Sequence, residues 1–338
     1  RDVRIMAYMR SRDKLEQAKR DGVVDVILDG IGEEISWCDL VFLCTPVEYN
    51  ASYLEQIRPL LKPGALVTDV GSTKTDIHET VKRLCMEEVF VGGHPMAGSE
   101  KTGYENSTDH LLENAYYMIT PTEKSTPEQI GRIRRVALSI GAIPMVTDYR
   151  QHDFSVAAVS HLPHLVASSL VNLVRDNDNE EELMRTIAAG GFKDITRIAS
   201  SSPVMWEQIC MTNTENILTL LKRYIASLES ICDTLEHHDG SAIYRMFEES
   251  GKYRSSFPNR GRGPIERDYS FSVDVLDEPG SISVLSAILA AKGISVKNMG
   301  INHSREEGEG ALRISFYKEE QKNEAASLLK SHNYVLTK

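Results

Sequence analysis

Short apolar runs alternate with helical segments at the start of the chain, and this alternation constrains its fold more than any other feature. Almost no polar side chains interrupt the runs at residues 3–8, 40–44, 65–70 and 89–91. Helical patterns separate them at residues 11–19, 47–60 and 73–86. Nearly uniform apolar strands that alternate with helices predict a doubly wound parallel α/β sheet, whose ligands gather at the carboxyl ends of the strands.

The sheet pattern ends near residue 148, and a long helical region follows. Two more strands are expected at residues 115–120 and 143–146, with a helix over 127–139. Helical patterns then occupy residues 149–174, 180–189, 195–200, 203–235 and 240–253. A dinucleotide-binding domain over 1–148 and a helical domain for substrate binding and dimerisation over 149–255 are therefore predicted.

A linker and a small third domain complete the chain. Residues 256–268 are rich in proline, glycine and arginine, as linkers often are. Beyond them, strands at 269–275, 294–299, 312–317 and 334–336 and helices at 281–292 and 322–331 give the order βαββαβ. This order predicts a split-βαβ domain over 269–338.

Composition excludes several classes of protein. The formal charge of −11 argues against a nucleic-acid partner. The sequence shows no apolar run of roughly 18 residues and no leader at its start, so we expect a cytoplasmic protein without a membrane span. The five cysteines are scattered without a C-x-x-C spacing, which speaks against both disulfides and a zinc site.

The segment from Val91 to Gly103 places His94 among glycines after an apolar strand. A loop of small residues at a strand end would expose the imidazole to a substrate, so His94 is a candidate base. The alternative is that Gly92, Gly93 and Gly98 only shape a turn around a surface histidine. These residues alone do not decide between the two.

Two other strand ends carry polar side chains. Ser72 stands between the strand over 65–70 and the next helix, where it would cap that helix or lie beside a cofactor or His94. Thr45 and Pro46 follow the strand over 40–44, and the proline is first of all a strand terminator.

The helical region holds two further candidate groups. His161 and His164 share a helical face, and Pro163 is expected to bend the backbone there. Without a third ligand nearby, they suit a polar ligand better than a metal.

Lys193 and Arg197, four residues apart after the glycine pair 190–191, would repel each other on one face unless an anion bound them. A surface ion-pair face with Asp194 and Glu182 is an equal alternative, and Trp206 would pack or wall a pocket.

Four motifs resemble those of the prephenate dehydrogenases of tyrosine biosynthesis. They are Asp-Val-Gly-Ser-Thr-Lys at 69–74, Gly-Gly-His-Pro-Met-Ala-Gly-Ser at 92–99, Ser-His-Leu-Pro-His at 160–164, and Gly-Gly-Phe-Lys-Asp-Ile-Thr-Arg-Ile-Ala at 190–199 followed by Met-Trp. Residues 269–338, with Asp-Glu-Pro-Gly at 277–280, resemble an ACT domain, which senses amino acids. Together the resemblances cover nearly the whole chain.

The resemblance implies an NAD-dependent homodimer that converts prephenate to 4-hydroxyphenylpyruvate and is inhibited by tyrosine. It implies that His94 accepts a proton, that Ser72 orients it, and that Arg197 grips a substrate carboxylate. Further substrate positions would be His164, His161, Lys193, Ser99, Glu100, Asp194 and Trp206. Cofactor positions would be Thr45, Pro46, Gly71, Ser72, Met9 and Arg10, and effector positions Asp277, Pro279, Gly280 and Asn298.

The sequence departs from the family pattern at the cofactor site. The G-x-G-x-x-G loop that holds a pyrophosphate is not in the sequence, and we expect it to lie upstream of residue 1. The acidic residue expected for the ribose is also not there, because Met9 and Arg10 stand at that strand end. Arg10, Ser11 and Arg12 would suit a 2′-phosphate, so NADP is an alternative to NAD.

Three alternative functions remain open. An arogenate dehydrogenase would run the same chemistry on a substrate with an amine in place of the keto group. A catalytically inactive regulator would use the ACT domain alone. A β-hydroxyacid dehydrogenase shares the order of domains but relies on a helical lysine and gives no reason for His94.

Overall fold

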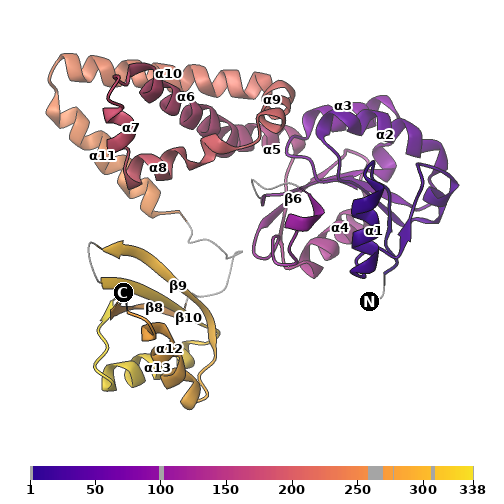
Figure 1. Cartoon of the computed structure of the whole chain (residues 1–338). Coiled ribbons are helices and arrows are strands. Elements are labelled where there is room, and N and C mark those ends of the chain that lie inside the picture. Colours follow the sequence, from indigo (N-terminus) through magenta and orange to yellow (C-terminus); the bar gives the residue numbers. More distant parts are fainter. Residues whose placement is uncertain (1–2, 99–102, 258–268, 277, 306–308, 338) are drawn as a thin grey trace. The chain divides into compact units, whose positions relative to one another are not determined.

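The computed structural model describes residues 3–98, 103–257, 269–276, 278–305 and 309–337. The chain divides into two compact units, Arg1–Arg262 and Gly263–Lys338. Figure 1 labels their helices and strands. Each unit is considered separately below.

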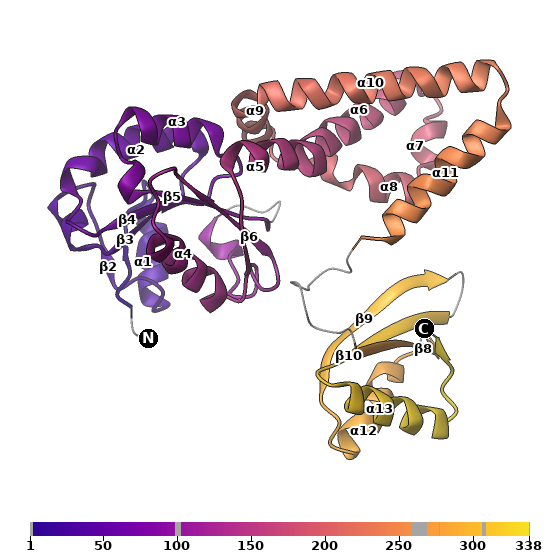
Figure 2. The same ribbon diagram turned by 180° about the vertical axis from the view of Figure 1, so that it is seen from behind.

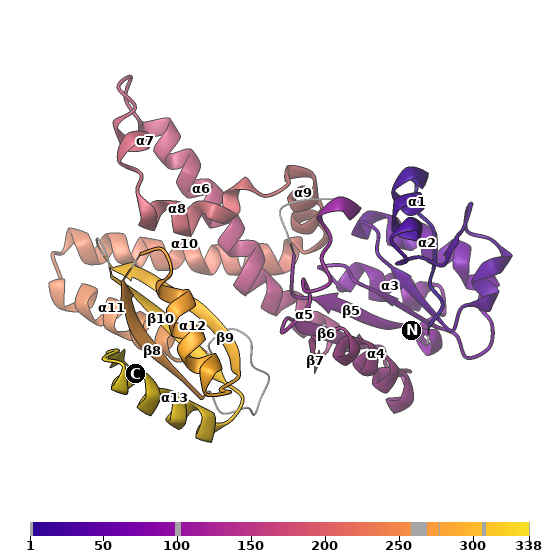
Figure 3. The ribbon, with the colours of Figure 1, turned by 60° about the horizontal axis from the view of Figure 1, so that its bottom comes forward.

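Seven strands form the sheet region of the first unit. They are β1 (Met6–Ala7), β2 (Val26–Ile27), β3 (Leu40–Leu43), β4 (Leu66–Asp69), β5 (Val91–Pro95), β6 (Tyr116–Pro121) and β7 (Ile143–Val146). The pairs β1–β2, β3–β4 and β6–β7 are parallel, and a parallel bridge joins Val67 of β4 to Phe90 just before β5. Figure 3 shows β5, β6 and β7 side by side.

The prediction of an entirely parallel sheet is wrong at one pair, because β5 and β6 are antiparallel. A parallel pair needs a crossover connection, usually a helix. In the described part of the connection between these strands, the structure has turns and the short 3-10 helix η5 (Tyr104–Asn106). The chain therefore returns beside β5 in the opposite direction.

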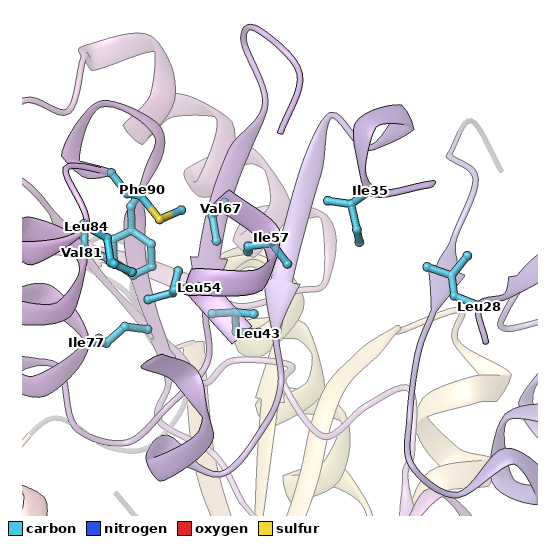
Figure 4. Close-up of a cluster of buried hydrophobic side chains, with 11 residues drawn as sticks. Leu28, Ile35, Leu43, Leu54, Ile57, Val67, Ile77, Val81, Leu84 and Phe90 are labelled. Atoms are coloured by element: carbon cyan, nitrogen blue, oxygen red, sulfur yellow. The ribbon is translucent and has the colours of Figure 1, made fainter. Parts of the chain in front are cut away.

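Helices cover both faces of this sheet. They are α1 (Arg12–Arg20), α2 (Asn50–Ile57), α3 (Thr75–Arg83) and α4 (Pro127–Ser139). On one face, Leu54 of α2 and Val81 of α3 pack with Val67 of β4, as Figure 4 shows. Leu66, the neighbour of Val67 in the strand, packs toward Ile133 of α4 in a second core. The alternation of adjacent strand residues between two cores confirms a sheet that is buried on both faces.

The rest of the first unit is helical, as predicted. After α5 (Tyr149–Val156) come the π-helical turn η6 (Ala157–His161), α6 (Leu162–Asn177), α7 (Leu183–Ile187), α8 (Gly190–Thr196), the 3-10 helix η7 (Arg197–Ser200), α9 (Pro203–Thr212), α10 (Thr214–Glu236) and α11 (Gly240–Ser255). Figure 2 shows this helical region from behind. The π-helical turn lies directly before Pro163, where the sequence predicts an irregular backbone.

One helical stretch differs from the expectation that no segment could span a membrane. Residues Tyr149–Asn177 are long and apolar enough to do so by length and composition, the only such stretch among the described residues. A single helix of this kind is weak evidence for a membrane span, because core helices of folded domains meet the same criteria of length and composition. His152, Asp153 and His161 lie buried within it and hydrogen-bond to other parts of the unit. These polar contacts explain the stretch as part of a folded domain.

The second unit has the predicted βαββαβ order. Its elements are β8 (Tyr269–Leu276), α12 (Ser281–Ala291), β9 (Val296–Arg305), β10 (Glu309–Phe316), α13 (Glu319–Ser331) and β11 (Leu336–Thr337). The strands form an antiparallel sheet in the order β11–β8–β10–β9. Both helices lie on one face of it in Figure 1, where Leu285 and Leu329 pack with Val273 and Ile314.

Candidate active site

His94 lies inside strand β5, where it pairs with Met118 of β6, so the prediction that it sits in a loop after the strand is wrong. Gly92 and Gly93 are strand residues too, which corrects the alternative that they shape a turn. A Cβ at Gly93 would lie 2.7 Å from both the Asp69 carbonyl oxygen and the Tyr117 hydroxyl. The glycines therefore allow close strand packing below the histidine.

The electrostatic surroundings of His94 keep its imidazole neutral. Burial lowers its pKa well below 6.5, and a positive charge on His152, Lys74 or His161 lowers it further. A neutral imidazole at pH 7 can accept a proton, as a general base must.

His94 is connected to the first turn of α5. Its Nδ1 lies 2.8 Å from Nε2 of His152, and Nδ1 of His152 lies 2.8 Å from Oδ1 of Asp153. The carboxylate of Asp153 also accepts hydrogen bonds from the backbone N–H groups of Lys74 and Thr75, at 2.8 and 2.7 Å, and from the Thr75 hydroxyl. One buried carboxylate thus joins the histidine pair to the start of α3.

This arrangement overturns the prediction that Ser72 caps the following helix. Helix α3 begins at Thr75, and the side chain of Asp153 accepts the N–H groups that a cap would bind. Ser72 lies three residues earlier, half-buried in the loop after β4. Its hydroxyl is therefore not used as a helix cap.

Lys74 holds the strand ends together beneath the site. Its ammonium is fully buried, pairs with Asp69 of β4 and donates to the carbonyl oxygen of Gly93 at 2.8 Å. Asp69 also accepts the N–H groups of Gly71 and Gly93 at 2.9 and 3.2 Å. Burial lowers the pKa of Lys74, and the charge and hydrogen bond of Asp69 oppose that shift.

A second branch of hydrogen bonds leads to His161. The amide nitrogen of Asn213 donates to the backbone oxygen of Asp153 at 2.8 Å and to Nδ1 of His161 at 3.1 Å. Burial lowers the pKa of His161 to about 4, so its ring is neutral. Because Nδ1 accepts, the proton sits on Nε2, and His161 can donate a hydrogen bond there.

His164 and Trp206 form an aromatic wall beside this branch. Their rings stack with centroids 3.7 Å apart, and His161 meets Trp206 edge-on at 6.0 Å, so both histidines face one indole. Nδ1 of His164 donates to the carbonyl oxygen of Ser160 at 2.8 Å, which leaves Nε2 as an acceptor. Burial lowers the pKa of His164, and the charge of Arg197 adds to this shift, so Arg197 lies near this wall.

The cationic pair is arranged differently from the prediction of one continuous helical face. Lys193 lies in α8, which ends at Thr196, and Arg197 begins the 3-10 helix η7. Glu182, the partner in the surface alternative, instead pairs with Arg185 at 2.7 Å. Asp194 and Lys193 are exposed on α8.

Three predicted residues, Ser99, Glu100 and Asp277, lie outside the described residues.

The predicted cofactor residues lie at the carboxyl ends of the first strands. Thr45 follows β3 and donates to Oδ1 of Asn50 at 2.9 Å, and Pro46 directly precedes the 3-10 helix η2 (Val47–Tyr49). Met9 and Arg10 follow β1, and the Arg10 guanidinium lies over the Tyr49 ring, 5.3 Å from its centroid. This edge is where dinucleotides bind in α/β sheets.

Sequence reasoning missed the residues that connect these parts: His152, Asp153, Asn213 and Lys74. His152 and Val156 are four residues apart, which places a histidine on the apolar face of α5. Polar residues at core positions of an amphipathic helix are a signal of a buried network. That signal was in the sequence, but the partners on α3 and β5 are distant in sequence.

Family models and curated relatives match most of this chain. The family model for the prephenate dehydrogenase nucleotide-binding domain matches residues 1–146, and the model for the prephenate dehydrogenase dimerization domain matches residues 148–249. A prephenate dehydrogenase from Bacillus subtilis is 36% identical over 330 residues, which cover 97% of this chain and 89% of the relative.

Two solved structures resemble the first unit. Prephenate dehydrogenase from A. aeolicus, in complex with hydroxyphenyl propionate and NAD+, has a TM-score of 0.70 and 30% identity, over 75% of this chain and 89% of that chain. Arogenate dehydrogenase from Synechocystis has a TM-score of 0.69 and 28% identity, over 75% of this chain and 91% of that chain.

The matched nucleotide-binding domain and the matched dimerization domain define an oxidoreductase that uses a nicotinamide cofactor. Within this class, the chain belongs to the prephenate dehydrogenase family.

Proposed function

We propose that the protein oxidises prephenate to 4-hydroxyphenylpyruvate and CO₂ with NAD+ as the hydride acceptor, and that His94 is the base. The observation that carries this proposal is the half-buried, neutral His94 at the carboxyl edge of the sheet, connected through His152 to Asp153. A cofactor bound at this edge would present its nicotinamide to the same place.

His94 accepts the proton of the ring C4 hydroxyl while the hydride leaves C4. As the C4 carbonyl forms, the ring carboxylate leaves as CO₂, and the electrons of the broken bond complete the aromatic ring. Arg197 binds a substrate carboxylate, because a guanidinium matches a carboxylate with two parallel hydrogen bonds. Lys193 supplies a second positive charge for a dicarboxylate.

The neutral histidines orient the substrate by complementary hydrogen bonds. His161 offers a donor at Nε2 and His164 an acceptor at Nε2, as their partners Asn213 and Ser160 require. The indole of Trp206 stacks on His164 and forms a flat wall for a ring. Ser72, Ser99, Glu100 and Asp194 are assigned to the pocket by the family motifs.

The residues present fit a dinucleotide. The amide nitrogen of Asn50 is buried beside Thr45 without a hydrogen-bond partner among the described residues, so a polar cofactor group would satisfy it. A Cβ at Gly71 would lie 2.9 Å from Val47, so the strand-end loops pack closely there. The bound nicotinamide supplies the hydride acceptor.

The ion pairs of Arg12, which lies just after β1, favour NAD over NADP. Arg12 is paired with Asp29 and lies 3.4 Å from Glu16, so neighbouring carboxylates already neutralise the guanidinium that a 2′-phosphate would need. Met9, Arg10, Thr45, Pro46 and Gly71 then remain to contact the adenosine and ribose groups.

The second unit is assigned to regulation. Its βαββαβ order and antiparallel sheet suit an ACT domain that binds tyrosine and lowers activity. Gly280 has φ 99° and precedes α12, so the Pro279–Gly280 turn has a backbone that favours glycine. Asn298 lies on β9 opposite Ser315 of β10. The active form is a cytoplasmic homodimer.

Arogenate is the second candidate substrate, because the chain has 28% identity to a structure of an arogenate dehydrogenase. A spectrophotometric assay with each substrate and each cofactor, with tyrosine titrated in, decides among these. Reduction of NAD+ by prephenate, inhibited by tyrosine, is the expected result. Turnover of arogenate alone would assign the other substrate, and tyrosine without effect would remove the regulatory role.

A further inference from the structure

His152 stands between His94 and Asp153, with a hydrogen bond of 2.8 Å on each side. His152 and Asp153 are buried, with exposed fractions of 1% and 0%. Neither residue belongs to the motifs on which the family resemblance depends. Their position behind His94 raises the question of which ring nitrogens carry the protons.

The carboxylate fixes the direction of both hydrogen bonds. Burial alone would raise the pKa of Asp153, but hydrogen bonds from His152 and Thr75 outweigh it and lower the pKa, so the group is ionised. An ionised carboxylate only accepts, so Nδ1 of His152 carries a proton. With Nδ1 used in this way, Nε2 of His152 can present its lone pair to His94, and His94 then donates from Nδ1 across the 2.8 Å contact.

We propose that Asp153 and His152 are positioning residues that hold His94 in the tautomer with its lone pair on Nε2. This inference rests on the proposed function, in which His94 accepts the substrate hydroxyl proton. The same pair stabilises the imidazolium that forms, because the His94 Nδ1–H bond to His152 strengthens and Asp153 supplies a negative charge behind it.

The groups that face His94 explain why such support is needed. A positive charge on His94 is disfavoured by the ammonium of Lys74 before α3, and also by His152 on α5 or His161 at the end of η6 whenever either ring is protonated. A base in these surroundings holds a proton poorly. The carboxylate of Asp153, which follows His152 in the hydrogen-bonded chain, opposes this effect when the proton arrives.

Two substitutions at His152 separate this role from a structural one. His152→Gln places an amide oxygen near the position of Nε2, where it can accept from His94 but no longer reaches Asp153. His152→Asn places an amide N–H near the position of Nδ1, where it can donate to Asp153 but leaves His94 unpaired. The two variants thus each keep one of the two hydrogen bonds.

We expect His152→Asn to lower kcat by about 10²-fold or more with KM changed less than about threefold, and His152→Gln to lose about tenfold or less. Asp153→Asn should lower kcat and move the acidic limb of the pH profile to lower pH, because it removes a charge that favours protonated His94. The proposal would be overturned if His152→Asn kept a near-normal kcat while His152→Gln lost most of it. His152 would then serve only to hold Asp153 in place.

The tautomer can be observed without catalysis. In the full-length protein labelled with ¹⁵N-histidine, long-range ¹H–¹⁵N spectra at pH 7.5 report which nitrogen of each ring carries the proton, and His94→Asn identifies the His94 signals. The proposal predicts a protonated Nδ1 and an unprotonated Nε2. The opposite tautomer overturns the proposal. Absence of prephenate turnover in the wild type would instead contradict the proposed function, and the spectrum would still determine the tautomer of His94.

Discussion

The backbone N–H of Lys74 donates a 2.8 Å hydrogen bond to Oδ1 of Asp153, which lies 79 residues later in the chain. A carboxylate from α5 therefore occupies the N-terminal end of α3, where the helix dipole favours negative charge. The same residue, Lys74, reaches with its side chain to Asp69 and Gly93 below His94. His94, the strand ends and the first helix of the helical region form one connected structure.

Thr75→Ala tests this connection. The Thr75 hydroxyl lies 2.6 Å from Oδ2 of Asp153, and a hydrogen bond to a charged group contributes about 2 kcal/mol. We expect the free energy of unfolding to fall by about that amount and kcat to fall several-fold, as measured by urea titration and initial rates. Thr126→Ala is the matched control, because it removes the capping box of α4 far from the site. It should cost about 1 kcal/mol and leave kcat unchanged.

Lys74→Met should destabilise the protein by about 3–5 kcal/mol, because it leaves the carboxylate of Asp69 buried without its cation. Adding Asp69→Asn should recover part of this loss, since the second substitution removes the buried charge. Urea unfolding of the two variants provides the comparison. A Lys74→Met protein within about 1 kcal/mol of wild type would show that the buried pair does not support the site.

Gly93→Ala should lower the free energy of unfolding by about 2 kcal/mol or more, because the new Cβ would lie 2.7 Å from the Asp69 backbone oxygen. Gly98→Ala serves as the control, because a Cβ there meets nothing within 4 Å. Its effect should stay within about 0.5 kcal/mol. Equal melting temperatures for the two variants would contradict the close packing described for β5.

Stability should fall on acidification, and His78 should account for part of the loss. Burial lowers the pKa of His78 to about 4, so the unfolded chain, with a pKa near 6.5, binds more protons between these values. The stability that this group contributes is present above pH 6.5 and lost as the pH falls toward 4. About 2 kcal/mol of it should disappear between pH 7.5 and 5, and His78→Gln should show a correspondingly smaller pH dependence in urea titrations.

The sequence predicts an element correctly where the contacts that determine it join residues close together in the chain. The helix over 127–139 was predicted with the bounds of α4, where Thr126 and Gln129 form a capping box. The βαββαβ order of the second unit also followed from turn residues and alternation. These features depend on short-range chemistry that the sequence displays directly.

Long-range pairing was harder to predict. The antiparallel β5–β6 pair follows from the path of the connection between the strands, which strand periodicity does not reveal. The sequence indicates His94 as a candidate base, but its place within β5 and its partner His152 depend on contacts across 58 residues. Asp153 as the cap of α3 replaced a serine that local capping rules favour, because tertiary contacts outweighed them.

The central claim is that His94 accepts the substrate proton, and the most direct measurement compares kcat with substrate affinity in His94→Asn. The account predicts that kcat for prephenate falls by about 10³-fold while the dissociation constant changes less than about threefold. Arg197→Ala, which removes a carboxylate contact, should instead chiefly raise KM. Near-normal kcat in His94→Asn would contradict the account.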